Sequence, residues 1–115
     1  EQILDAIMKK AIVSITDRSG RILVVNDAFC AVSGYAREEV LGRTHALINS
    51  RTHPADFWPS VWRRISAGHP WLGEVCNRAK DGSLFWLDGI IAPLVSADGE
   101  IERFLSIRAD VTARL

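Results

Sequence analysis

The sequence contains few cysteines and no long apolar run. Its 115 residues include only Cys30 and Cys76, which are too few for a disulfide framework and are not spaced as a metal-binding pair. We expect both thiols to be reduced and buried, as free cysteines usually are. A membrane span would need about 18 consecutive apolar residues, and none are present. Because the first residues do not resemble a signal peptide either, we expect a cytoplasmic domain without membrane contact.

The sequence also has no excess of charge of either sign. Lys+Arg 14 and Asp+Glu 14 give a formal net charge of zero. Nucleic-acid binding generally needs a basic surface, so we expect no nucleic-acid partner. The sequence has no Gly-rich phosphate loop, no H-E-x-x-H and no G-x-S-x-G. We therefore expect no catalytic activity from this chain.

The length and the apolar content fit one domain with its own core. Hydrophobic residues make up 48% of the chain, which is enough to form a core without disulfide bonds or a structural metal ion. Residues 1–10 form an amphipathic pattern that predicts a cap helix ahead of the main domain, residues 11–115. The apolar side of this helix needs a partner, and we expect a homodimer interface there. The residues on that side are Ile3, Leu4, Ile7 and Met8.

Turn signals divide residues 11–115 into strands and helices. Asp-Gly pairs mark two hairpin turns, and Asp56 is the expected N-cap of a helix with Pro59 in its first turn. This order predicts an α+β fold in which helices cover one face of a five-stranded antiparallel sheet. The predicted elements are a hairpin over 11–26, helices over 28–34 and 35–43, a longer helix that follows Asp56 and ends at Gly68, and strands Trp71–Arg78, Leu84–Val95 and Ile101–Asp110.

One face of the predicted strand Trp71–Arg78 is suited to the wall of a pocket. The charged residues Glu74 and Arg78 share the opposite face, which indicates that this opposite face is the more exposed to solvent. A buried Asn77 needs hydrogen-bond partners, because an unpaired amide costs about 1–3 kcal/mol. A flat heteroaromatic ring with carbonyl and imide edges would suit this surface. Alternation places on the inward face the side chains of Trp71, Gly73, Val75 and Asn77.

Two long stretches resemble the halves of a PAS domain. "DRSGRILVVNDAFCAVSGYAREEVLGR" is similar to the amino-terminal half, with its N-x-A-F and GY-x-x-EE-x-x-G motifs. "NRAKDGSLFWLDGIIAPLVSADGEIERFLSIRADVTAR" is similar to the carboxy-terminal half. The resemblance implies a PAS fold and a sensory module excised from a larger signalling protein, with an output domain such as a kinase, a cyclic-di-GMP enzyme or a chemoreceptor. Asp110 and Thr112 would then form the signal exit.

The segment "PWLGEVCNRAKDG" also resembles a motif of flavin-binding PAS domains in redox and aerotaxis sensors. That resemblance implies that Trp71 packs beside the flavin and that Asn77 binds its polar edge. Arg51 and His53 would approach the phosphates or the adenine side of FAD. Both residues lie in the loop before the predicted helix that follows Asp56. Asn49 completes the expected cofactor-binding set, and the expected signal is the redox state of the flavin or oxygen.

Other interpretations stay open. The same motif occurs in sensor-kinase PAS domains without a cofactor, which implies a module for dimerisation, protein–protein interaction or small-ligand sensing. In that case Trp71 fills the core, and Asn77 caps a turn or bonds to a loop backbone. Haem would need an axial ligand, and His53 is the best choice, ahead of His45 and of His69, which we expect on the surface.

Two further features bear on the pocket. In flavin-thiol light sensors a Cys lies in a G-R-N-C-R-F-L stretch, and here the corresponding segment over residues 42–48 has His45 in its place. We therefore expect no thiol adduct. Trp58 and Trp62 lie beside the apolar face of the predicted helix that follows Asp56. They either shield the sheet or form a subunit interface.

Overall fold

The computed structural model describes residues 2–114, except for the side chains of Leu4, Ile7 and Met8. The helices are α1 (Gln2–Lys10), α2 (Asp27–Ser33), α3 (Arg37–Val40) and α4 (Phe57–Ser66), with short 3-10 helices η1 (His45–Ile48) and η2 (Thr112–Arg114). The strands are β1 (Ile12–Asp17), β2 (Ile22–Val25), β3 (Trp71–Arg78), β4 (Leu84–Val95) and β5 (Ile101–Asp110). The predicted bounds of the last three strands are confirmed.

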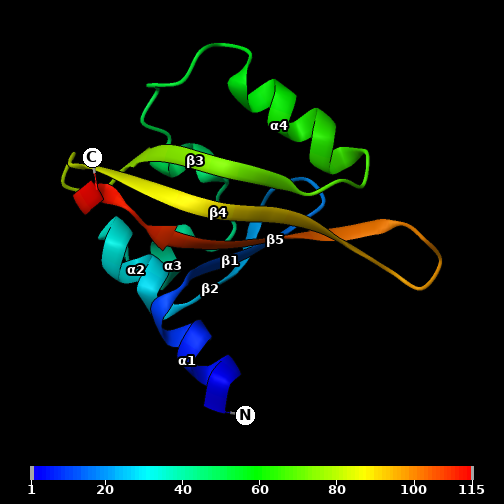
Figure 1. Cartoon of the computed structure of the whole chain (residues 1–115), viewed down its shortest axis with the longest axis horizontal. Coiled ribbons are helices and arrows are strands. Elements are labelled where there is room, and N and C mark those ends of the chain that lie inside the picture. Colours follow the sequence, from blue (N-terminus) through cyan, green and yellow to red (C-terminus); the bar gives the residue numbers. More distant parts are fainter. Residues whose placement is uncertain (1, 115) are drawn as a thin grey trace.

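The strands form one antiparallel five-stranded sheet in the order β2-β1-β5-β4-β3. The predicted α+β class is therefore confirmed. Figure 1 shows α4 (green) beside the β3 edge and α1 (blue) projecting beyond the β1–β2 edge. Ser14, Leu87 and Phe104 lie on the face that we call the inner face, which looks towards α2, η1 and α4.

The core consists of two groups of apolar side chains on the inner face. Around Phe29 of α2, the buried side chains include Ile22, Val40 and Leu87. Beneath α4, a second group contains Val61, Ile65 and Phe104, with Trp58 and Trp71 packed against it. Burying aliphatic and aromatic side chains of this size contributes about 1.5–3 kcal/mol each. The groups hold α2 and α4 at different parts of the same face.

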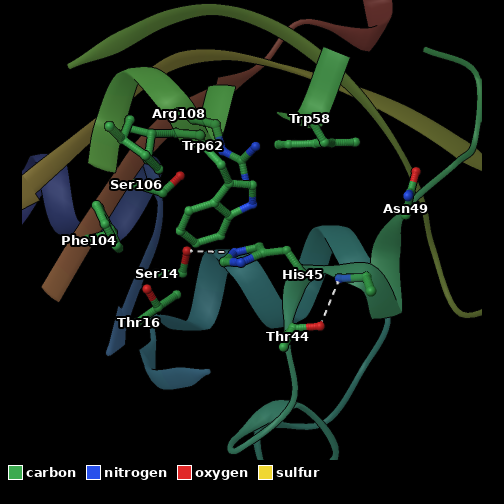
Figure 2. Close-up of a pocket in the computed structure, with 13 residues that line it drawn as sticks. Ser14, Thr16, Thr44, His45, Asn49, Trp58, Trp62, Phe104, Ser106 and Arg108 are labelled. Atoms are coloured by element: carbon green, nitrogen blue, oxygen red, sulfur yellow. Dashed lines mark hydrogen bonds between the residues drawn. The ribbon is translucent and has the colours of Figure 1, made fainter. Parts of the chain in front are cut away.

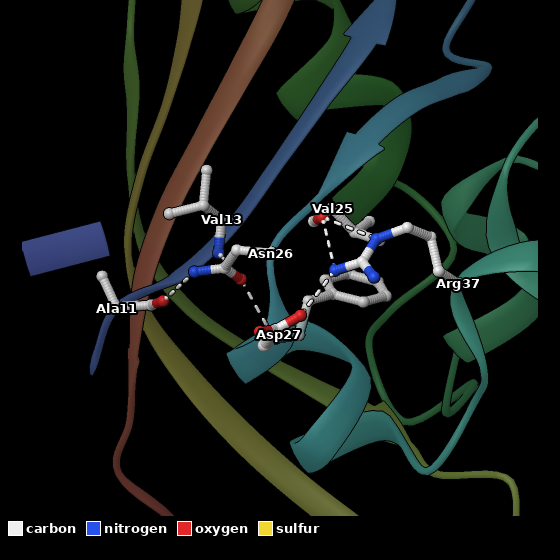
Figure 3. Close-up of polar contacts among 7 residues, drawn as sticks. Ala11, Val13, Val25, Asn26, Asp27 and Arg37 are labelled. Atoms are coloured by element: carbon white, nitrogen blue, oxygen red, sulfur yellow. Dashed lines mark hydrogen bonds and ion pairs between the residues drawn. The ribbon is translucent and has the colours of Figure 1, made fainter. Parts of the chain in front are cut away.

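Asn26 joins α2 to the beginning of the sheet (Figure 3). Its Oδ1 accepts hydrogen bonds from the backbone N–H of Phe29 and of Val13, both at 3.1 Å. Its Nδ2 donates to the carbonyl of Ala11 at 2.7 Å. The first of these bonds is an N-cap, for which Asn is among the preferred residues. The other two fix the point where the chain passes from α1 into β1.

Some local expectations are corrected by the structure. Asp56 precedes α4, but its side chain makes no capping hydrogen bond because the residue has a helical backbone conformation. Pro59 does lie in the first turn. Cys76 is buried as expected, whereas Cys30 is only half-buried because it lies on the rim of α2.

The cap helix forms as predicted over Gln2–Lys10. Ile3 is 72% exposed, and the side chains of Leu4, Ile7 and Met8 lie outside the described part of the structure. The proposed dimer interface therefore stays a prediction. Within residues 2–114, no helix has the length and apolar content that a membrane span requires.

Candidate functional site

A cavity of about 370 Å³ lies between the inner face of the sheet, η1 and α4 (Figure 2). Its size falls at the lower end of the range usual for small-molecule sites, about 300–1,000 Å³. The residues that line it are Ser14 and Thr16 of β1, Thr44, His45, Ala46 and Asn49 around η1, Trp58, Trp62 and Ile65 of α4, Ile91 of β4, and Phe104, Ser106 and Arg108 of β5.

Sheet register brings the floor of the cavity together. Ser106 pairs with Ser14 on one side and with Ile91 on the other. Directly paired residues point to the same face of an antiparallel sheet, so the three side chains share the inner face. Residues two apart along a strand also share a face, which adds Thr16 and Arg108. Strands β1, β4 and β5 thus supply one floor, and its polar side chains come from β1 and β5, which are distant in sequence.

The roof is aromatic. The ring of Trp62 meets that of Phe104 edge to face, with centroids 5.3 Å apart. Trp58 lies beside Phe57 in the same geometry, at 5.0 Å. Trp62 keeps 38% of its surface exposed, so it covers the cavity from the outside. The two tryptophans shield the sheet, as one of the two interpretations of the sequence expects, and they also wall a cavity. Their role at a subunit interface stays a prediction.

Arg108 is a buried cation in this cavity. It is 4% exposed, and no ion pair involves it within the described part of the chain. Its Nε and the Oγ of Ser106 are buried without a hydrogen-bond partner among the residues that the structure describes. Burial lowers the pKa of Arg108 to about 10, so the guanidinium stays protonated at neutral pH. Buried charges are normally paired, which makes this residue exceptional.

His45 is the second ionisable group of the cavity. Its Nε2 lies 3.0 Å from the Oγ of Ser14, and its ring meets Phe29 edge to face at 6.2 Å. Burial, and to a smaller extent the nearby Arg108, lower the pKa of His45 to about 3. The imidazole is therefore neutral at pH 7, with one nitrogen as donor and the other as acceptor.

Of the residues predicted to bind a cofactor, Asn49 lines the cavity. Asn77 lies next to it, because an isolated antiparallel bridge joins the two residues. The side chain of Asn77 is 2% exposed, and its Nδ2 has no hydrogen-bond partner among the described residues. The structure thus brings Asn49 and Asn77 together at the same side of the site.

Trp71 lies on the inner face, as alternation predicts, but outside the cavity lining. Its ring folds over Gly73, where an added Cβ would come within 2.8 Å of it. On its other side the ring meets Phe57 at 5.6 Å. The room that Gly73 leaves is therefore filled by Trp71 itself.

Arg51 and His53 lie in the loop between η1 and α4. Arg51 is exposed, has φ 61, and donates its backbone N–H to Oδ1 of Asn49 at 2.8 Å. His53 accepts a hydrogen bond on Nε2 from the backbone N–H of Cys76 at 2.9 Å and stacks on Phe57 at 4.0 Å. In this position His53 fastens the loop to the edge of β3.

The other histidines show no metal-binding arrangement. His69 is exposed, as the sequence predicts for this turn. No group of three or more His, Cys, Asp or Glu side chains that could hold a metal ion occurs among the described residues. His45 is engaged with Ser14.

The expected signal exit is tied to the sheet through Trp86. Thr112 Oγ1 accepts a hydrogen bond from the backbone N–H of Trp86 at 2.9 Å. Asp110 Oδ1 in turn accepts from both the backbone N–H and the hydroxyl of Thr112, at 3.0 and 2.5 Å. The ring of Trp86 meets His53 edge to face at 5.9 Å. The exit segment and the loop beside the cavity thus share Trp86.

Sequence reasoning missed most of the polar floor. The sequence feature that would have identified this floor is a polar residue at an inward position of an otherwise apolar strand. In "IVSITD" this position is taken by Ser14 and Thr16, and in "FLSIRAD" by Ser106 and Arg108. Alternation applied to β1 and β5, as it was to β3, identifies all four.

Comparison with known proteins gives a consistent assignment. A family model described as a PAS domain matches residues 9–113. The nitrogen fixation regulatory protein of Klebsiella pneumoniae is 31% identical over 100 residues, which are 87% of this chain and 20% of that protein. The aerotaxis receptor of Escherichia coli is 34% identical over 101 residues, covering 88% and 20%. The chain spans about a fifth of the length of these relatives.

Solved structures share the fold. An RNA-binding light-oxygen-voltage receptor superposes with a TM-score of 0.85 and 22% identity, over 98% of this chain and 33% of that one. A light-oxygen-voltage domain studied with a flavin analogue gives a TM-score of 0.84 and 24% identity, over 99% and 87%. These similarities show the architecture of the five-stranded sheet and its helices.

Proposed function

The chain belongs to the PAS domain family, and on this premise we propose that it is a sensory module that binds FAD in the cavity between η1 and α4 and responds to redox state or oxygen. Its relatives include a nitrogen fixation regulatory protein, an aerotaxis receptor and a blue-light-activated histidine kinase. These are signalling proteins, and the chain resembles one domain of each. The flavin would supply the redox chemistry. The protein would bind the flavin and respond to its redox state.

One observation carries the proposal: an aromatic-walled cavity contains buried donors that lack partners. Arg108 Nε and Ser106 Oγ line the cavity, and Asn77 Nδ2 lies beside it. A native fold leaves few buried polar atoms unpaired, and each needs an explanation. The edge of a flavin ring offers carbonyl and ring-nitrogen acceptors, and its faces suit Trp58 and Trp62. The residues present therefore fit this group.

The loop between η1 and α4 supports an extended ligand. Asn49 lines the cavity, and exposed Arg51 is bonded directly to it. We place the ring end of FAD inside the cavity and its phosphates on the side of Arg51. His53 would act indirectly, by holding this loop to β3. Asn77 would bind the polar edge, and Trp71 would support the roof through Phe57.

The route to the exit runs through Trp86. A change at the cavity that moves the loop around His53 alters the contact of this ring with Trp86. Trp86 holds Thr112 by a backbone hydrogen bond, and Thr112 is bonded to Asp110. A local change in bonding would thus bias the exit segment between two arrangements.

The remaining features of the proposal concern the surroundings of the domain. We propose a non-catalytic module in the cytoplasm, linked covalently to an output domain such as a kinase of a two-component system. We further propose a homodimer in which the exposed Ile3 of α1 contributes to the interface. Mass measurement in solution, with and without residues 1–10, tests the dimer; an unchanged association state after the removal would refute the role of α1.

The flavin proposal is tested by absorbance. Purified protein, before and after incubation with FAD and removal of unbound cofactor, is expected to show flavin bands, and the released cofactor is identified by mass spectrometry. The variant Trp58→Ala removes part of the aromatic roof and is expected to bind FAD weakly, whereas Trp86→Phe, outside the cavity, keeps binding. Colourless protein after reconstitution contradicts the proposal.

A second function is supported by the position of Trp71. Its ring fills the space over Gly73, as it would in a cofactor-free module for dimerisation or protein–protein interaction. That function predicts colourless protein and a self-association that is lost without α1. The absorbance measurement separates the two functions, since both expect self-association through α1.

A further inference from the structure

We propose that Arg108 makes the cavity selective for planar aromatic ligands that carry negative charge on the edge facing the guanidinium. For a flavin, this means that the reduced anion binds more tightly than the oxidised ring. The flavin statement rests on the proposed function, whereas the charge preference of the cavity does not.

The first argument is that Arg108 lacks a counter-charge. Arg37, by contrast, lies at the surface and still forms an ion pair with Asp27 at 2.8 Å. Arg108 is 4% exposed, and its Nε has no partner within residues 2–114. A buried cation without a partner is costly, because desolvation is not offset by attraction. The missing partner is an anion that the described residues do not provide.

The second argument concerns the other groups that face the guanidinium. The lining from β1, η1, α4, β4 and β5 contains hydroxyl, amide, imidazole and apolar groups, and no Asp or Glu. His45 is held neutral by burial and by Arg108, so its pKa falls to about 3. The cavity therefore has a net positive charge at neutral pH.

The third argument is the direction of the side chain. An added Cβ at Gly89, which pairs with Arg108, would come within 2.8 Å of its Cγ. The absence of a side chain at Gly89 thus leaves a groove for the aliphatic stem of Arg108. Figure 2 shows the guanidinium reaching into the same space as Trp58, Trp62 and His45. The stem is seated on the sheet, and the charge lies in the cavity.

The fourth argument sets the class of ligand. Arg108 and Asn77 Nδ2 are donors, and Ser106 adds a hydroxyl. The ligand edge must therefore be rich in acceptors. The opposite walls are aromatic or aliphatic, from Trp58, Trp62 and Ile65. A flat ring with an anionic edge satisfies both surfaces, whereas a small inorganic anion would leave the apolar walls uncovered.

For a flavin, the preference appears on reduction. The ring takes up two electrons and one proton at N5, and it then carries a negative charge at N1. In a titration the electrons come from dithionite, which is oxidised to sulfite. A cation beside this edge stabilises the reduced form over the oxidised one. Tighter binding of the reduced form is the same quantity as a raised reduction potential.

A pair of matched probes tests the charge preference without a flavin. Naphthalene-2-sulfonate and neutral naphthalene-2-sulfonamide share the ring and differ in charge. The protein is expected to bind the sulfonate about tenfold more tightly, as a charge-assisted hydrogen bond predicts. Arg108→Gln is expected to abolish the preference, Arg108→Lys to retain it, and Arg103→Gln, exposed on the same strand, to leave it unchanged. Equal binding by the unaltered protein overturns the proposal, whether or not Arg108→Gln folds.

Flavin binding provides the second test. Riboflavin, which lacks phosphate, is titrated oxidised and dithionite-reduced, and the ratio of the two dissociation constants is measured. Arg108→Gln is expected to lower the preference for the reduced form about tenfold, which is about 30 mV for two electrons. If the protein binds flavin with an unchanged ratio, the role of Arg108 is wrong and the flavin function stands. If it binds no flavin but prefers the sulfonate, the flavin function is wrong and the role of Arg108 stands.

Stability separates a binding role from a structural one. If Arg108 serves the ligand, Arg108→Gln is expected to raise the melting temperature of the free protein, because an unpaired buried charge is removed. The same variant weakens binding of the sulfonate. A lower melting temperature together with unchanged sulfonate preference would identify Arg108 as a structural residue and overturn the proposal.

Discussion

Asn26, which directly follows β2, and Arg108 of β5 are both polar residues, and they differ in how their hydrogen bonds are satisfied. Asn26 joins three backbone groups by bonds of 2.7–3.1 Å (Figure 3). Arg108 is buried with Nε unpaired in a cavity. A hydrogen-bond network in which every polar atom is paired stabilises the fold. Buried polar atoms that stay unpaired can bind the polar atoms of a ligand. The comparison separates a residue that fixes the fold from one that we propose to bind a ligand.

Breaking the satisfied network is expected to have the largest effect. Asn26→Ala removes three hydrogen bonds and leaves buried backbone groups unpaired, so unfolding in urea should show a loss of about 2–4 kcal/mol. Asn26→Asp keeps the acceptor for Val13 and Phe29 and loses only the donor to Ala11. Its loss should be clearly smaller. Equal losses would show that the two accepted bonds contribute little.

Substituting Gly89, which packs against Arg108, is expected to have the next largest effect on the free energy of unfolding. A Cβ at Gly89 would come within 2.2 Å of the backbone oxygen of Ile107, and Gly89→Ala should cost about 1–3 kcal/mol by overpacking. At Gly73 the added atom would meet the ring of Trp71, a side chain that can move. Gly73→Ala should therefore cost less in the same urea measurement. A reversed order would contradict the close strand approach at Gly89.

Acidification is expected to destabilise the cavity through His45. Its pKa is lowered from 6.5 to about 3 on folding, so the unfolded chain binds a proton that the folded protein does not. This stability is present above pH 6.5 and is lost as pH falls towards 3. Between pH 7 and 5 the loss should be about 1–2 kcal/mol. His45→Gln should flatten the dependence, and an unchanged slope would show that the pKa of His45 is not lowered on folding.

The smallest effect is expected at a surface ion pair. Lys80 and Glu39 are 2.8 Å apart, with side chains 54% and 38% exposed. Exposed pairs contribute little because water and salt screen them. Lys80→Gln should leave the urea midpoint within experimental error at physiological salt. A clear shift would mean that the contact of Lys80 with the Tyr35 ring, 5.9 Å from its centroid, is significant.

The candidate site could be predicted only in part. Alternation correctly placed Asn77 and Trp71 on the inner face, since period two is a local property of a strand. It did not show that the Trp71 ring closes over Gly73, because that depends on the rotamer and on Phe57 of α4. Asn49 was in the expected set and lines the cavity, whereas the neutral state of His45 depends on burial by distant segments.

The sequence by itself determined the strands, the turns and the resemblance to PAS domains. These depend on residues within a few positions of one another or on long matching motifs. Only the tertiary structure decided that Ser14, His45 and Arg108 face one cavity. Their convergence requires β1 and β5 to be neighbours in the order β2-β1-β5-β4-β3. It also requires η1 and α4 to lie over the same face, and long-range packing rather than local preference sets both.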